Sequence, residues 1–330
     1  MTDPALTMLA QFGIAVVATP DDGLTVRQFL PQVVAASTPS SRRTYGTYWT
    51  RMVELWGDRR VDSIRATDVE ALQQQCAAHA RPRRRNYRGG RHAGENANSA
   101  ARAYFRRAEA DGIIPVGSSP AQQVPKLRRL PNSRRALLPW ELQAIIEVAR
   151  TTGNDVILLR LHTETACRRG GALALCLEDL DTGTGLVRLR EKNETMRWQP
   201  ITLTLASRLA DHARLRGAVL PEDQLLRYRN CQPITSRRYD HLWTRIGEHL
   251  PWVAAQGIST HWLRHTTLTW VERNFSYGIA RAYAGHTDHT GPATTTYIKA
   301  DIHAVAAALS TLTGEPHPLA LGLDELGFLA

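Results

Sequence analysis

The chain has 330 residues, a length that predicts about two domains and excludes a single small module. Hydrophobic residues make up 43% and charged residues 22%, which excludes wholesale disorder. Forty-one Lys and Arg against 31 Asp and Glu give a net charge of +10, so we expect either a polyanionic partner or a solvated basic surface.

Two classes of protein are disfavoured by what the sequence lacks. No stretch approaches the ~20 apolar residues of a membrane span, and the first residues lack the basic-then-apolar order of a signal peptide. The four cysteines are scattered without a C-x-x-C pair, so we expect them to be reduced and buried. Together these features predict a cytosolic protein.

The first part of the chain carries a helical pattern. Residues 1–23 have weak periodicity and are predicted to be a leader. Residues 24–116 are predicted to be an all-helical domain, because apolar residues recur at helical spacing. The expected helices cover residues 25–36, 39–57, 62–77 and 96–112.

Basic residues are concentrated just before the fourth predicted helix. Nine Arg against one Glu give residues 81–107 a local charge of +8, and residues 120–137 add +5 without an acid. The remainder is therefore slightly acidic. Gly89 and Gly90 would let this segment approach a nucleic-acid backbone closely. We expect DNA contacts from Arg81, Arg83, Arg84, Arg85, Arg88, Arg91, Lys126, Arg128 and Arg129.

A second domain follows a basic linker. Residues 117–136 contain three prolines and little periodicity, which predicts an extended interdomain linker. The second domain is expected over residues 137–314, with a C-terminal tail over 315–330. Its predicted helices begin with Pro139 in a first turn and continue over 155–163, 171–177, near 205, 235–249, 262–274 and 300–312.

The second domain also contains one stretch of period two. Residues 185–190 and 196–203 flank the polar sequence EKNET, which predicts a β-hairpin with Lys192 in its turn. The predicted fold class is therefore mainly α with a small antiparallel β-sheet.

The densest group of polar side chains is THWLRHTT at residues 260–267, at the start of a predicted helix. His261 and Arg264 share a face in its first turn, where backbone N–H groups favour an anion. A zinc protease motif would need Glu where Trp262 stands, so we reject a metal site. The alternative is that the histidines belong to the core and the arginine to the surface.

Two further motifs give this group a context. TETACRRGGALAL, at 163–175, places Arg168 and Arg169 in a glycine-containing turn before a helix. AYAGHTDHTGPATTTYIKA, at 282–300, contains His286 and Tyr297. With these residues in this order, the sequence resembles the tyrosine recombinase (phage integrase) family.

The resemblance extends over nearly the whole chain, with several departures from the family pattern. Residues 165–171 resemble the family signature T-G-x-R-x-x-E, with Arg168 as its arginine but Ala166 for the glycine and Gly171 for the acid. The H-x-L-R-H motif is matched in full by residues 261–265, and Ala284-Gly285-His286 resembles L-G-H. The tyrosine falls on Tyr297, two residues further from its histidine than the family pattern predicts.

The resemblance implies a fold and a set of catalytic roles. It implies a helical (SAM-like) core-binding domain followed by a mixed α/β catalytic domain that uses no cofactor and no metal. Arg168, Arg264 and His286 would hold the phosphate, His261 would assist the nucleophile Tyr297, and Lys192 would protonate the departing 5′ oxygen. The product would be a 3′-phosphotyrosyl link and a free 5′-hydroxyl.

The implied function is site-specific recombination of double-stranded DNA, in integration, excision or resolution. The family further implies a homo-tetramer on two DNA sites, exchange of the C-terminal helix between protomers, and a location at the nucleoid. Two alternatives stay open: a DNA-binding protein of the same fold with impaired cleavage, and a nicking-closing enzyme of the type IB topoisomerase kind.

Other tyrosines, arginines and histidines are alternative candidates for the same roles. Tyr239, Tyr277 and Tyr283 are interpreted as packing or DNA-backbone residues, because they lie in or beside predicted helices. Arg169 lacks the motif spacing of Arg168, and His265 is interpreted as a structural histidine.

Overall fold

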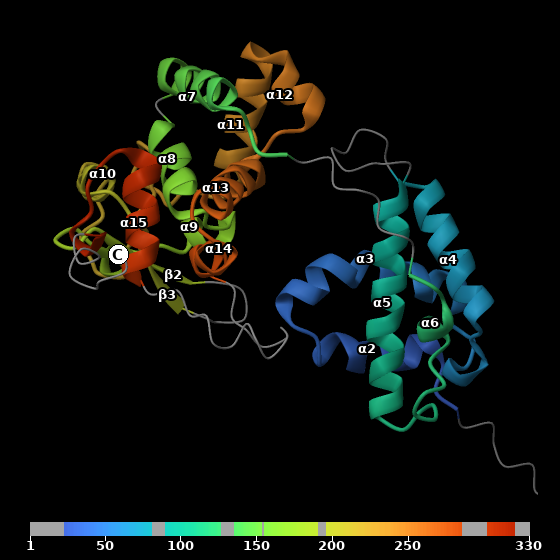
Figure 1. Cartoon of the computed structure of the whole chain (residues 1–330). Helices are drawn as coiled ribbons and strands as arrows, with labels where there is room; N and C mark the ends of the chain where they lie inside the picture. Colours follow the sequence, from blue (N-terminus) through green and yellow to red (C-terminus); the bar gives the residue numbers. More distant parts are fainter. Residues whose placement is uncertain are drawn as a thin grey trace, which may run out of the picture. The chain divides into compact units, whose positions relative to one another are not determined.

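The computed structural model describes residues 23–80, 90–126, 135–153, 155–190, 196–285 and 302–320. The chain divides into two compact units, Met1–Pro131 and Asn132–Ala330, each with its own apolar core (Figure 1). The described part is mainly helical with one small antiparallel sheet, which confirms the predicted fold class. None of the described helices combines the length and apolarity needed to cross a membrane.

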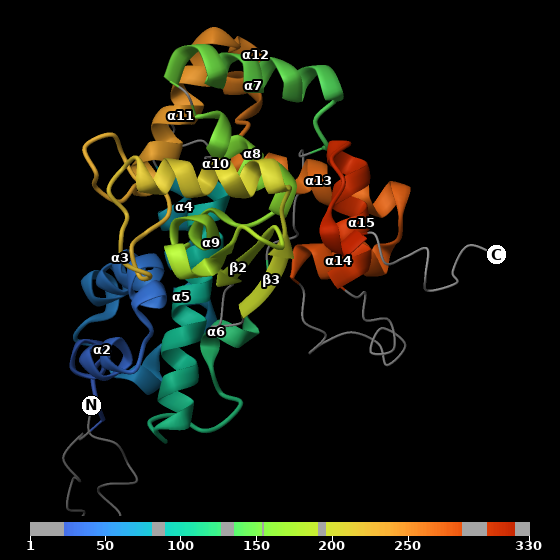
Figure 2. The ribbon, with the colours of Figure 1, turned by 90° about the vertical axis from the view of Figure 1, so that its left-hand side faces the viewer.

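The first unit is a group of helices around α5. Trp49 donates from Nε1 to the Ala100 carbonyl at 3.0 Å, and Tyr104 donates to the Val26 carbonyl at 3.2 Å, so two buried aromatic residues fix neighbouring elements to one another. The small residues along α5 let α3 and α4 pack closely beside it (Figures 1 and 2). The elements are α2 (Val26–Ala35), α3 (Pro39–Trp56), η1 (Val61–Ser63), α4 (Ala66–Ala78), α5 (Arg91–Ala110) and α6 (Pro120–Gln123).

Helix α5 begins at Arg91, five residues earlier than predicted, because Gly90 provides a left-handed turn before it. Gly90 has φ +76°, and a Cβ atom there would lie 1.8 Å from the Ala77 carbonyl oxygen. This glycine therefore permits close packing between α4 and the start of α5. The expectation that Gly89 and Gly90 allow a close approach to a nucleic-acid backbone stays a prediction.

The predicted linker is partly folded. Helix α6 buries Pro120 and Ala121, and Val124 is also buried in the core of the first unit. Arg102 secures this segment by donating to the carbonyls of Ala121 (2.9 Å) and Val124 (2.6 Å). Residues 117–124 thus belong to the first unit, because apolar contacts that periodicity did not reveal hold them there.

The second unit combines helices with a three-stranded antiparallel sheet of order β1-β2-β3. Strands β2 and β3 pair with Leu186 opposite Pro200 and Arg190 opposite Met196, which confirms the predicted hairpin. The strands are β1 (Leu180–Asp181), β2 (Leu186–Arg190) and β3 (Met196–Pro200). The helices are α7 (Pro139–Gly153), α8 (Val156–Thr165), α9 (Arg169–Leu173), η3 (Leu177–Asp179), α10 (Leu203–Arg214), α11 (Ser236–His249), α12 (Pro251–Gln256), α13 (Thr260–Asn274), α14 (Tyr277–Ala284), α15 (Ile302–Thr313) and η5 (Pro318–Ala320).

Helices α13, α14 and α15 pack together, as Figure 2 shows, around a small apolar cluster. That cluster includes Ala166, the residue that ends α8, together with Val271, Tyr283 and Leu309. The C-terminal end of α8 is therefore built into the same cluster as the last three helices.

The segment after α15 packs on its own unit. Glu315 forms an ion pair with Arg160 at 2.9 Å. His317 is buried, with Nε2 3.0 Å from the Gly185 carbonyl oxygen and Nδ1 accepting from the Leu319 amide at 3.1 Å. These contacts hold residues 315–320 against the strand that begins after Gly185.

The cysteines differ from expectation. All four are free, but Cys167 alone is buried, whereas Cys231 is exposed. Cys231 lies in a tight turn with φ +64°, where its amide donates to the Tyr228 carbonyl at 3.1 Å. The turn places this side chain outside the core.

Candidate active site

Arg264 is the central side chain of the candidate site. It lies in the first turn of α13, beside His261, and is only 5% exposed. Its Nη1 donates to the Ala166 carbonyl and its Nη2 to the Ala284 carbonyl, the latter at 2.8 Å. One guanidinium therefore joins the start of the Thr165–Arg168 motif to the start of the Ala284–His286 motif.

The backbone conformation of Ala166 permits the first of these contacts. Ala166 ends α8 in the left-handed region, with φ +50° and ψ +23°, and its side chain is fully buried. Alanine adopts this conformation at a cost of roughly 1–2 kcal/mol. Arg168, two residues later and exposed, precedes α9 at its N-terminus. Since consecutive Cα atoms are ~3.8 Å apart, Arg168 begins at most ~8 Å beyond the residue that Arg264 contacts.

A buried histidine supports the backbone on the other side of this motif. His162 Nδ1 lies 3.1 Å from the Cys167 carbonyl oxygen, and its Nε2 lies 2.9 Å from Tyr239 Oη. Burial lowers the pKa of His162 to about 4, so the ring is neutral near pH 7. Neutral histidine then donates from Nδ1 to Cys167 and accepts at Nε2 from Tyr239, which fixes the residue before Arg168.

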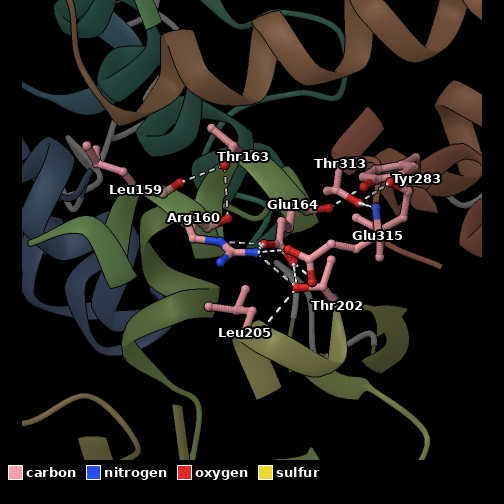
Figure 3. A network of polar contacts seen from close by, with 10 residues as sticks. Leu159, Arg160, Thr163, Glu164, Thr202, Leu205, Tyr283, Thr313 and Glu315 are labelled. Carbon is pink, nitrogen blue, oxygen red and sulfur yellow. Dashed lines mark hydrogen bonds and ion pairs between the residues drawn. The ribbon is translucent and has the colours of Figure 1, made fainter. Parts of the chain in front are cut away.

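A second network holds Glu164, just before the motif (Figure 3). One carboxylate oxygen accepts from the Thr202 amide and hydroxyl, both at 3.0 Å, and the other accepts from Arg160 Nε at 2.9 Å. The Glu164 carbonyl accepts from the hydroxyl of Tyr283 in α14. Burial raises the pKa of Glu164, and Thr202 and Arg160 oppose that rise. The network thus ties α8 to the start of α10, to α14 and, through Arg160, to Glu315.

Arg264 and His261 line a cavity of about 290 Å³. Tyr277 of α14 also lines it and is 58% exposed, with Arg281 5.6 Å from its ring centroid. His265 lines the same cavity, and its Nδ1 lies 3.0 Å from Thr269 Oγ1. A guanidinium, two imidazoles and a phenol are therefore brought together by α13 and α14.

The other candidate tyrosines in the described ranges are enclosed. Tyr239 and Tyr283 are buried, and burial raises the pKa of both hydroxyls. Their packing roles agree with the prediction. The exposed position of Tyr277 was missed, because the spacing of a short helix does not show which neighbours cover it.

The described residues also bring the hairpin close to the third motif. Gly285 has φ +66°, and a Cβ atom there would lie 2.3 Å from Nε of Arg197, a residue of β3. Strand β3 continues from the turn in which Lys192 is predicted. The hairpin and the Ala284–Gly285 segment are thus in contact through Arg197, a residue that no motif singled out.

Several predicted residues lie outside the described ranges. These are Lys192, His286 and Tyr297 of the predicted catalytic set, and Arg81, Arg83, Arg84, Arg85, Arg88, Arg128 and Arg129 of the predicted DNA contacts. Of the remaining two DNA contacts, Lys126 is exposed, and Arg91 lies 3.5 Å from the carboxylate of Glu95.

The departure at Gly171 is located against strand β2. A Cβ atom at this position would lie 3.4 Å from the Arg190 carbonyl oxygen, so there is room for a small side chain. Arg169 is directed to Asp240 of α11, with Nη1 and Oδ1 3.3 Å apart. Within the described ranges, no three His, Cys, Asp or Glu side chains gather as a metal site.

Comparison with known proteins agrees with this arrangement. The model of the phage integrase family matches residues 135–302, which is half of the chain. A lambda integrase dimer bound to a COC′ core site shares the fold at 15% identity, with a TM-score of 0.61 over 90% of this chain and 85% of that one.

Two other solved structures share the fold. A lambda integrase tetramer bound to a Holliday junction has 15% identity and a TM-score of 0.60, over 86% of this chain and 79% of that one. The Tn1549 transposon integrase in complex with transposon right end DNA has 15% identity and a TM-score of 0.62, over 88% and 100%. No curated protein sequence gives a match. The match to the family model and the shared fold show that the chain belongs to the phage integrase family of tyrosine recombinases.

Proposed function

We propose that this protein is a site-specific DNA recombinase that cuts and rejoins strands through a 3′-phosphotyrosyl intermediate. The observation that carries the proposal is the position of Arg264, whose guanidinium is buried between the carbonyls of Ala166 and Ala284. Membership of the family and the DNA-bound state of the integrases that share its fold support the same function.

In the proposed reaction, the Tyr297 hydroxyl oxygen attacks the phosphorus and displaces the 5′ oxygen of the next nucleotide. His261 accepts the phenolic proton, and Lys192 donates a proton to the departing oxygen. Arg168, Arg264 and His286 stabilise the charge that develops on the non-bridging oxygens. Because the phosphotyrosyl ester stores the bond energy, the reverse attack by a 5′-hydroxyl reseals the strand without an external energy source.

The proposed assembly is a homo-tetramer on two DNA sites, as in the lambda integrase tetramer bound to a Holliday junction. Exchange of a C-terminal segment between protomers is part of the proposal. Since residues 315–320 are held by Arg160 and Gly185 of their own unit, the exchanged part would begin after Ala320. Recombination of this kind would place the protein at the nucleoid.

We further propose a division of labour along the chain. Residues 24–116 would form the core-binding domain and 137–314 the catalytic domain, with basic residues between 81 and 129 contacting DNA phosphates. The excess of Arg over acidic residues in this region supports that role.

A nicked suicide DNA substrate containing the recombination site tests the proposed chemistry. Wild-type protein should form a covalent adduct with the 3′ end of the cut strand, visible on a denaturing gel. Arg264→Ala should reduce adduct formation at least a hundredfold, whereas Arg273→Ala, an exposed change in the same helix, should leave it intact. Absence of any adduct with wild-type protein would contradict the proposal.

Gly171 favours a second candidate, a DNA-binding protein with impaired cleavage. The family acid, which in the family helps to hold the arginine at the position of Arg168, is absent here. Specific binding without an adduct would identify this second candidate. If the protein forms the adduct, relaxes supercoiled DNA as a monomer and never yields recombinants, it would be a type IB topoisomerase-like enzyme.

A further inference from the structure

A second, larger cavity opens in the catalytic unit. Its volume is about 710 Å³, within the range of pockets that bind small molecules. The wall is formed by the start of α8, the end of α10, the loop between α10 and α11, and α11 itself. None of its lining residues belongs to the cavity that contains His261 and Arg264.

Five arginines line this cavity, which we call the arginine pocket: Arg216, Arg227, Arg229, Arg238 and Arg245. A single lining carboxylate, the buried Asp155, accepts from two of them. Arg238 Nε donates to Asp155 Oδ1 at 2.9 Å, and Arg245 donates to Oδ2. Asp155 therefore orients two guanidiniums but neutralises only one of the two charges.

The other side of the pocket keeps further positive charge. Arg227 is paired with Asp223 at 3.3 Å. Neither Arg216 nor Arg229 forms an ion pair in the part of the chain that the structure describes, and Arg216 donates instead to the Arg227 carbonyl at 2.7 Å. Among the described residues, the five guanidiniums of the pocket thus form ion pairs with two carboxylates, those of Asp155 and Asp223.

The positive charge of the pocket is partly enclosed, so the neighbouring guanidiniums repel one another. Burial lowers the pKa of Arg216, and the nearby charges of Arg229 and Arg238 lower it further. His212 adds no charge near pH 7, because burial and Arg216 hold its pKa at about 4. An anion in the pocket would offset this repulsion.

We propose that the arginine pocket binds a phosphate group. Guanidiniums donate paired N–H groups that match phosphate oxygens, and the excess of guanidiniums over carboxylates suits a doubly charged phosphate better than a carboxylate. Tyr228 and Ile157 add an aromatic and an apolar surface on which a sugar or base can lie. The phosphate has two sources, a free nucleotide or the backbone of DNA, and the binding chemistry is the same for both.

The test uses the full-length protein and two probes. 2′-Deoxyadenosine 5′-monophosphate is titrated by calorimetry, and a 20-base-pair duplex without a recombination site is titrated by fluorescence anisotropy. The test variant is Arg216→Gln with Arg229→Gln. The control is Arg208→Gln with Arg214→Gln, which removes two exposed arginines of α10 outside the pocket. If the double variant fails to fold, the single variant Arg229→Gln, at an exposed position, is titrated in its place.

Saturable binding of the monophosphate that weakens at least tenfold in the test variant but not in the control supports the proposal, with a free nucleotide as the source. A tenfold loss confined to the duplex supports it with DNA as the source. Equal affinities of test and control variants for both probes would overturn the proposal. So would monophosphate binding that disappears with Arg264→Gln, because the anion would then occupy the active-site cavity.

Discussion

At the scale of single residues, Arg264 and Ala166 explain how distant motifs meet. The two residues are 98 positions apart, yet the guanidinium of one contacts the carbonyl of the other. This contact depends on the left-handed backbone of Ala166, a position where the family pattern has glycine. Alanine here combines a strained backbone with a methyl group packed in the cluster of α13–α15.

Substitution of Ala166 tests this balance. Ala166→Gly should change the free energy of unfolding by less than ~1 kcal/mol, because relief of the left-handed strain offsets the lost methyl contact and the more flexible unfolded chain. Ala166→Val should cost more than ~2 kcal/mol, because a β-branched residue adopts this conformation poorly. Urea unfolding of both variants measures the difference, and a stable Val variant would show that residue 166 is not left-handed.

At the same scale, the buried carboxylate of Glu164 depends on Arg160 for a compensating positive charge. Removing this guanidinium with Arg160→Met leaves Glu164 buried without its cationic partner, so we expect a loss of about 3 kcal/mol at pH 7. Glu315→Gln, which removes a partly exposed partner of the same arginine, should cost less than ~1 kcal/mol. Thermal and urea unfolding distinguish the two, and equal losses would contradict the network in Figure 3.

The loss of stability caused by Arg160→Met should be smaller at acidic pH than at pH 7. Protonated Glu164 carries no charge to be left unpaired, so the loss caused by Arg160→Met should shrink as the pH falls toward the raised pKa of this carboxyl group. A loss that is constant between pH 7 and pH 5 would argue against an ionised Glu164 in the folded protein.

At the scale of elements, α8 and α11 support the motif that contains Arg168. The side chain that provides this support is His162, which contacts both Cys167 and Tyr239. The folded-state pKa of His162 is about 4, below the unfolded value of ~6.5, so the unfolded chain binds the proton more readily. Its contribution to stability is fully present above pH 6.5 and is lost as the pH falls toward 4, by up to ~3 kcal/mol. His212, whose pKa is also about 4, adds a loss in the same direction.

His162→Gln should therefore flatten the fall in stability between pH 6.5 and pH 4.5. The exposed His241→Gln serves as the control and should leave the pH dependence unchanged. Urea midpoints measured across this interval give the comparison. An unaltered slope in His162→Gln would mean that the ring is accessible to protons in the folded state.

Most elements could be predicted because their signals are local. Thr25, Thr38 and Thr202 cap their helices as side-chain acceptors, and the alternation on either side of residues 191–195 specifies the hairpin. The short α12 and the two-residue β1 were missed, because too few residues carry the periodicity. The contacts of Gly90 and Arg264 could not be predicted, since each depends on a partner distant in the sequence.

At the scale of the whole molecule, the excess positive charge is concentrated in residues 81–107 and 120–137 rather than spread evenly along the sequence. If Arg83, Arg84 and Arg85 contact DNA phosphates, changing all three to Gln should reduce the slope of log affinity against log salt by about 2 to 3. Arg42→Gln with Arg43→Gln in α3 is a control for loss of charge elsewhere in the first unit. Anisotropy titrations between 50 and 300 mM salt measure the slope, and an unchanged slope would refute phosphate contacts by this run.

The candidate active site, which is assembled from distant parts of the chain, could be predicted only in part from the sequence. The order of Arg168, His261, Arg264 and Tyr297 follows from the sequence motifs, and the structure joins the segments of the first three through Arg264. The motifs did not predict that Tyr277 is exposed beside His261 and Arg264, because that depends on how α14 packs against α13. Tyr277 is thus a second candidate for the nucleophile, beside the proposed Tyr297.

The identity of the tyrosine that becomes linked to DNA distinguishes Tyr297 from Tyr277 as the nucleophile. Wild-type protein, Tyr297→Phe and Tyr277→Phe are incubated with the nicked suicide substrate, and the covalent peptide is identified by mass spectrometry. We expect an adduct on Tyr297 in the wild type and in Tyr277→Phe, and none in Tyr297→Phe. An adduct that persists in Tyr297→Phe, or one found on Tyr277, would contradict this expectation.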